Sequence, residues 1–114
     1  MYLDSGASIS ILFNNKLLNK IDTLPQAANV KAGGSDIKLT KGGALHRNLA
    51  SLPLPKEGYY YDKKALANLL SLACIVDEYW VTMDTRINDV IYVQSKTDGR
   101  TIRFQRCHEQ ICIA

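Results

Sequence analysis

The chain has 114 residues, of which 46% are hydrophobic and 22% are charged, and its net charge is +3 at pH 7. This composition is that of a globular domain, so it excludes intrinsic disorder, and the length predicts one domain rather than two. No apolar run approaches the roughly 18 residues of a membrane span, and the opening residues do not form a secretory leader. The mild positive charge does not by itself indicate a nucleic-acid partner.

Three cysteines, Cys74, Cys107 and Cys112, are too few and odd in number for a disulfide framework. They favour a reducing compartment. Cys107, His108 and Cys112 do not have the paired spacing of a zinc site, so we expect neither a metal nor a cofactor. Cys74 and Cys112 lie in apolar contexts and are predicted to be small buried hydrophobes.

The first third of the chain predicts strands and turns. Residues 2–13 indicate a strand, a turn at Ser5–Gly6 with Gly6 as its pivot, and a second strand at residues 9–12. Residues 14–21 predict one or two helical turns capped by an asparagine. Two alternating runs around Gly33–Gly34 then predict a β-hairpin.

The remaining two thirds predict more strands and one helix. Residues 45–54 are irregular, and residues 58–61 indicate a short strand. Asp62 is predicted to cap a helix over residues 63–73, because apolar side chains recur there at helical spacing. Those apolar residues are Leu66, Leu69, Leu70 and Ala73. Strands are further expected at residues 79–83, 90–93, 101–104 and 111–113, with a hairpin turn at residues 97–99.

The sharpest motif is Leu3-Asp4-Ser5-Gly6-Ala7. A strand that ends in an aspartate holds the carboxylate in place, and the turn that follows brings backbone N–H groups near it. Two such carboxylates about 3 Å apart share one proton, so that one activates a water and the other protonates a peptide carbonyl. The same residues also suit an ordinary surface turn, and the motif alone does not decide between the two.

Three motifs in order resemble a retropepsin, the dimeric aspartic protease of retroviruses and retrotransposons, and most of all its copia-type branch. They are the Asp-Ser-Gly-Ala motif, a glycine-tipped hairpin at Gly33–Gly34, and Asn68-Leu69-Leu70-Ser71 in the predicted helix. The resemblance implies a mainly β, closed-barrel domain with one short C-terminal helix over residues 1–84, here without its usual upstream strand. Residues 85–114 resemble the β-rich stretch toward integrase and would add a β-hairpin.

The resemblance implies a role for each matched residue. Asp4 would be catalytic, Ser5 would lock the two active-site loops together, and Gly6 and Ala7 would complete the substrate-binding turn. The flap that closes over substrate would consist of Ala32, Gly33, Gly34 and Ser35. Because the chain has one Asp-Ser-Gly motif, the two carboxylates would come from two subunits, with residues 79–83 as a candidate dimer strand.

The resemblance therefore implies an intracellular aspartic endopeptidase that acts as a homodimer on a retrotransposon polyprotein, within the cytoplasm or a virus-like particle. Its substrate would be a peptide, with no metal, cofactor, membrane or nucleic acid involved.

Two alternatives stay open. One is an inactive, retroelement-derived relic or scaffolding domain. The other is a nucleic-acid-binding β domain, in which aromatic residues would stack on bases beside arginines. Those residues are Tyr59, Tyr60, Tyr61, Trp80, Arg100, Arg103 and Arg106.

Overall fold

The chain is mainly β, as expected: strands make up 47% of it. The computed structural model describes residues 1–32, 35–65, 67–107 and 110–113. The strands are β1 (Tyr2–Asp4), β2 (Ser10–Leu12), β3 (Asp22–Ala32), β4 (Ser35–Gly43), β5 (Tyr59–Tyr61), β6 (Leu69–Ser71), β7 (Tyr79–Met83), β8 (Val90–Ser95), β9 (Thr101–Cys107) and β10 (Gln110–Ile113). Single helical turns occur at η1 (Asn15–Leu17), η2 (Arg47–Leu49) and α1 (Leu72–Ile75).

The helix predicted over residues 63–73 is wrong. Asp62 does accept a hydrogen bond from the Lys64 N–H at 2.9 Å, but it closes a turn rather than a helix. The Leu69–Ser71 segment is β6, which pairs in parallel with β1 and antiparallel with β2. Pairing with two strands from the other end of the chain overrides the helical preference of leucine and alanine, so the helix begins only at Leu72.

The strands form an open sheet, so the prediction of a closed barrel is wrong. Their order is β3-β4-β5-β2-β6-β1-β10-β9-β8-β7, and within the described residues no pairing joins the end strands β3 and β7. The β-hairpin expected within residues 85–114 is present as β8 and β9, and β10 follows it. These strands extend the sheet because β10 pairs antiparallel with β1. The domain boundary predicted between residues 84 and 85 stays a prediction; it falls in the turn that joins the paired strands β7 and β8.

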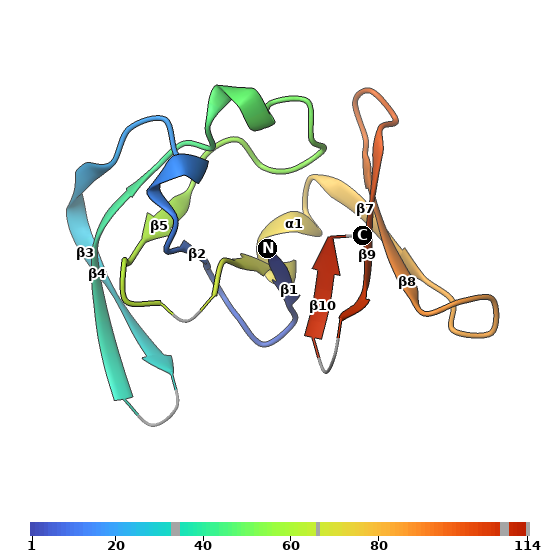
Figure 1. Cartoon of the computed structure of the whole chain (residues 1–114), viewed down its shortest axis with the longest axis horizontal. Coiled ribbons are helices and arrows are strands. Elements are labelled where there is room, and N and C mark those ends of the chain that lie inside the picture. Colours follow the sequence, from blue (N-terminus) through green and yellow to red (C-terminus); the bar gives the residue numbers. More distant parts are fainter. Residues whose placement is uncertain (33–34, 66, 108–109, 114) are drawn as a thin grey trace.

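One hydrophobic core runs along this sheet. It includes Leu3 of β1, Leu70 of β6, Val93 of β8 and Phe104 of β9, all at most 6% exposed. The irregular segment around η2 covers it with the fully buried Leu54. In Figure 1 this segment arches over the top, between the strands on the left and β7–β9 on the right.

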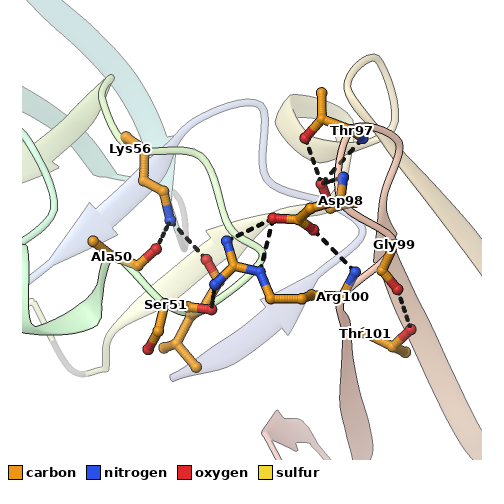
Figure 2. A network of polar contacts seen from close by, with 10 residues as sticks. Ala50, Ser51, Lys56, Thr97, Asp98, Gly99, Arg100 and Thr101 are labelled. Carbon is orange, nitrogen blue, oxygen red and sulfur yellow. Dashed lines mark hydrogen bonds and ion pairs between the residues drawn. The ribbon is translucent and has the colours of Figure 1, made fainter.

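A polar network ties the arch to the β8–β9 hairpin (Figure 2). The Arg100 guanidinium donates to the Ser51 carbonyl and is paired with Asp98 at 2.7 Å. Lys56 Nζ donates to the Ala50 and Leu52 carbonyls, each at 2.7 Å, within the arch itself. The segments before and after residue 84 therefore share contacts as well as a core.

Among the described residues, no helix has the length and apolar character needed to cross a membrane.

Candidate functional site

Asp4 lies where β1 ends, between β6 on one side and β10 on the other. It is half-buried, and its Oδ1 accepts a hydrogen bond from the Gly6 N–H at 2.8 Å. Ser5 and Gly6 are exposed, and Ala7 is half-buried. The strand thus delivers the carboxylate to a turn that is open to solvent, as the motif predicts.

Gly6 does not act as the predicted conformational pivot. The described glycines with positive φ are Gly58 and Gly99, at 87° and 73°, so Gly6 has an ordinary backbone conformation. A Cβ placed on Gly6 would lie 3.4 Å from Asp4 Oδ1. At this position a side chain would be in van der Waals contact with the carboxylate.

The same local turn occurs at three other aspartates. Asp62, Asp84 and Asp98 also accept a hydrogen bond from the N–H two residues later. At Asp84 and Asp98 that later residue is an arginine whose side chain binds the carboxylate at 2.8 and 2.7 Å. Hydrogen bonds from Arg100 lower the pKa of Asp98 to about 2, and Arg86 lowers the pKa of Asp84 in the same way.

At Asp4 the later residue is Gly6, which has no side chain to pair with the carboxylate. Among the described residues, no lysine or arginine lies within ion-pair distance of Asp4. One carboxylate oxygen is engaged by a backbone N–H, and the other is not committed to a cation. A carboxylate without a cationic partner is free to share a proton with a second carboxylate.

Ser71 holds the Asp4 turn from behind. It is fully buried, its Oγ donates to the Ala7 carbonyl at 2.6 Å, and its N–H donates to Ser10 Oγ at 2.9 Å. Its Oγ also accepts the Cys74 N–H at 3.3 Å, which caps α1. Cys74 Sγ donates in turn to the Ser8 carbonyl at 3.3 Å. The turn is therefore bound to β6 and α1 at two successive carbonyls.

Asn68, at the start of the Asn68–Ser71 motif, contacts both strands that flank β6, namely β1 and β2. Its Oδ1 accepts from the Phe13 N–H at 3.0 Å and the Asn14 N–H at 3.3 Å, just after β2. Its carbonyl accepts the Tyr2 N–H of β1 at 2.8 Å. The Asn68–Ser71 motif thus clasps the strand before the turn and the strand after it.

These supporting residues were not among the site residues predicted from the sequence. The Asn68–Ser71 motif identified the right segment. Because we assigned that segment to a helix, the sequence did not predict the contacts of Asn68 and Ser71. Cys74 is exposed and free, so its predicted burial is wrong. Ser10 had no signal beyond its place in an alternating strand.

Two backbone N–H groups of the turn point away from its support. In a trans peptide the N–H lies opposite the carbonyl. Because the Ala7 and Ser8 carbonyls face Ser71 and Cys74, the N–H groups of Ser8 and Ile9 face the other way. Within the described part of the chain neither N–H has a protein acceptor. The turn that begins at Asp4 therefore presents two adjacent backbone donors on the side away from Ser71 and Cys74.

The predicted flap hairpin is present as β3 and β4. They pair up to the Ala32–Ser35 register, while Gly33 and Gly34 lie outside the described residues. β4 lies four strand positions from β1, about 19 Å at the usual strand spacing. Figure 1 shows the hairpin and the β1–β2 turn at the same lower edge of the molecule. The predicted site residues 4–7 thus lie in one turn, whereas Ala32 and Ser35 lie on strands at least four positions away in the sheet.

An open hollow of about 410 Å³ lies at the other end of this hairpin, lined by residues of β3, β4 and β5 such as Asp22, Gly43 and Tyr60. Gly42 and Gly43 are required there by close packing. A Cβ on Gly42 would lie 2.3 Å from the Tyr59 carbonyl, and one on Gly43 would lie 2.1 Å from the Lys20 carbonyl. None of the predicted site residues lines this hollow.

The predicted aromatic platform is divided. Tyr59 is buried and donates to the Pro55 carbonyl at 2.8 Å, and burial raises its pKa. β5 and Trp80 of β7 lie in distant parts of the sheet order. Trp80, 54% exposed, shares instead the outer face of β7–β9 with Tyr92 and Arg103, whose guanidinium lies 6.0 Å from the Tyr92 ring centre.

Comparisons with protein-family models, with curated proteins and with solved structures found no match to this chain.

Proposed function

We propose that this chain is a retropepsin-like aspartic endopeptidase whose active site combines Asp4 from two subunits. The observation that supports this most is the Asp4 turn itself. Its carboxylate lies at a strand end, accepts one backbone N–H and has no cationic partner, whereas the equivalent turns at Asp84 and Asp98 are paired with arginine. A water between two such carboxylates would attack the peptide carbonyl, while the shared proton moves to the carbonyl oxygen.

The backbone donors of the Asp4 turn support a peptide as the substrate. The N–H groups of Ser8 and Ile9 face away from their support, as an extended peptide needs for its carbonyl groups. A polyprotein segment would bind along this turn, and the β3–β4 hairpin would have to move toward the turn to serve as the flap. The polyprotein substrate, the virus-like particle and the intracellular location remain implications of the resemblance.

The dimer has to form through the turn rather than through a sheet edge. If the β7 edges of two subunits paired, the two β1 strands would be nine strand positions apart, about 43 Å at the usual spacing. Pairing at the β3 edges would separate them further. The candidate dimer strand at residues 79–83 therefore does not suit the two-carboxylate site. Contact through the exposed Ser5 and Gly6 suits the two-carboxylate site, because these residues directly follow Asp4 and would bring the two Asp4 turns together.

The test is the Asp4→Asn variant, with Asp98→Asn as its matched control, on cleavage of a peptide library at pH 4 to 7. Both aspartates lie in the same type of turn. We expect Asp4→Asn to lower kcat/KM by about a thousandfold or more and Asp98→Asn to leave it unchanged. Equal cleavage by both variants and the wild type would assign the activity to a contaminant and end the protease proposal.

The relic alternative predicts a different pattern. A scaffolding domain would fold, would cleave no peptide at any concentration, and would be a monomer by sedimentation. Cleavage that increases with the square of protein concentration at low concentration would exclude it, because the active species is then the dimer.

The second candidate function is supported by the outer face of β7–β9. The strand positions of this face contain Trp80, Thr82, Tyr92, Gln94, Thr101, Arg103 and Gln105, and none of these is acidic. Exposed aromatic rings beside a guanidinium suit stacking on single-stranded bases. Trp80 is the sole tryptophan, so quenching of its fluorescence by a thymidine oligonucleotide reports binding directly. Quenching that weakens steeply with salt and is lost in Arg103→Gln but not in Lys38→Gln would establish this function.

A further inference from the structure

Ser71 connects the Asp4 turn to the rest of the fold in a way that no other described residue does. Its hydroxyl both donates to the Ala7 carbonyl at 2.6 Å and accepts the Cys74 N–H at 3.3 Å. Its own N–H donates to Ser10 Oγ at 2.9 Å, beyond the other end of the turn. The residue is 0% exposed, so water cannot replace these contacts when they are lost.

These contacts also determine which way the turn faces. Since the Ala7 carbonyl is directed at Ser71, the peptide plane between Ala7 and Ser8 cannot rotate without breaking the shortest hydrogen bond of the turn. The next plane is held by Cys74 Sγ on the Ser8 carbonyl at 3.3 Å. Rotation of either plane would move the outward N–H groups of Ser8 and Ile9, which lie in those planes. The Gly6 N–H that binds Asp4 Oδ1 belongs to the same turn, two peptide planes before the Ala7–Ser8 plane.

We infer that Ser71 is a positioning residue of the active site, which acts through the Ala7 and Ser8 peptide planes on the Asp4 carboxylate and on the peptide-binding N–H groups. This inference depends on the proposed protease function for its catalytic consequence but not for its structural one. Cys74, one helical turn later, makes the second contact. We call the two hydrogen bonds, from Ser71 Oγ to the Ala7 carbonyl and from Cys74 Sγ to the Ser8 carbonyl, the clamp.

Ser95 provides a matched control. It is also a buried serine, 7% exposed, and its Oγ contacts Thr97 Oγ1 at 3.0 Å and accepts the Thr97 N–H at 3.3 Å. It supports the β8–β9 turn instead of the Asp4 turn. Ser71→Ala and Ser95→Ala therefore remove the same group at two similarly buried positions, each of which supports one exposed turn. An effect on the Asp4 turn that exceeds the control cannot come from general loss of stability.

The first experiment measures cleavage by Ser71→Ala, Ser71→Thr and Ser95→Ala at a temperature at which all three are folded. We expect Ser71→Ala to lower kcat by about tenfold to a hundredfold, Ser71→Thr to restore most of it, and Ser95→Ala to remain near the wild type. A kcat of Ser71→Ala equal to that of Ser95→Ala would overturn the catalytic part of the inference.

The second experiment does not depend on activity. Amide chemical shifts of Gly6, Ser8 and Ile9 are compared by NMR in the same three variants. Ser71→Ala should shift all three amides, Ser71→Thr should return them toward the wild type, and Ser95→Ala should shift none. Unmoved amides in Ser71→Ala would refute the clamp. If the amides shift in Ser71→Ala but the wild-type chain cleaves no peptide, the structural role of Ser71 stands and the proposed function is rejected.

Discussion

Two exposed turns in this molecule begin with an aspartate and are stabilised in opposite ways. The turn at Asp98 is held by its own neighbours: Arg100 binds the carboxylate, Ser95 contacts Thr97, and Gly99 adopts a φ of 73°. The turn at Asp4 has one local hydrogen bond and is otherwise held by residues about 64 positions later in the chain. A turn that neutralises its own carboxylate is a structural element. In the turn held from a distance, the carboxylate has no cationic partner among the described residues.

The largest effect is expected from removing the distant support. Leu70 is fully buried at the centre of β6, beside Ser71. Leu70→Ala should lower the free energy of unfolding by about 3 kcal/mol through a core cavity, as measured by urea denaturation. Leu69→Ala, at a half-buried position on the same strand, is the matched control and should cost clearly less. Equal losses would mean that β6 is not the central support of the turn.

The comparison is tested most directly by giving the Asp4 turn the residue found at Asp98. Gly6→Arg places an arginine two residues after Asp4, as Arg100 follows Asp98. The backbone of Gly6 accepts a side chain, and its Cβ would meet Asp4 Oδ1 at an ordinary contact distance of 3.4 Å. Peptide cleavage should fall at least about a hundredfold, equivalent to about 2.7 kcal/mol, without unfolding. Gly6→Gln, similar in length but uncharged, separates the charge from the bulk.

Glycine should matter more in the locally built turn than in the other. Gly99 has a φ of 73°, so Gly99→Ala should destabilise the protein by about 1 kcal/mol. Gly6→Ala should cost less, because Gly6 is not in the left-handed region. Thermal unfolding of the two variants measures this difference. A larger loss from Gly6→Ala would show that the two turns differ less than their contacts indicate.

The smallest effect concerns acid. The pKa of Asp98 is lowered to about 2 by hydrogen bonds from Arg100, compared with an ordinary value of 3.8. A depressed folded-state pKa contributes stability that is present above pH 3.8 and is lost as the pH falls toward 2. Asp98→Asn should therefore flatten the fall of unfolding free energy between pH 4 and 2, measured by urea titration. Parallel curves for the variant and the wild type would contradict the pairing.

Local patterns predicted most of the strands but not their arrangement. Alternation and turn residues identified the β3–β4 and β8–β9 hairpins, whose partners are neighbours in the chain. The spacing of Leu66, Leu69, Leu70 and Ala73 fits a helix equally well on local grounds. What makes Leu69–Ser71 a strand is pairing with β1 and β2, which no local pattern records.

Neither the open sheet nor the clamp could be predicted from local sequence patterns. The position of β10 between β1 and β9 depends on pairing between residues far apart in the chain, and this pairing is part of the open strand order. The motif at Asp4 was visible because its chemistry lies in adjacent residues. Its support by Ser71 was not, since that contact depends on where β6 lies relative to β2.

The pairing of β1 with β10 also sets an order of events during synthesis. Tyr2 lies opposite Leu69 on one side and opposite Cys112 on the other, so β1 is completed by a strand about 110 residues later in the chain. Contacts this distant in sequence form late and slow the folding of a β protein. A ribosome would have to release the residues up to β10 before β1 could pair on both sides. In the nascent polypeptide the Asp4 turn would thus stay unassembled until β10 had emerged.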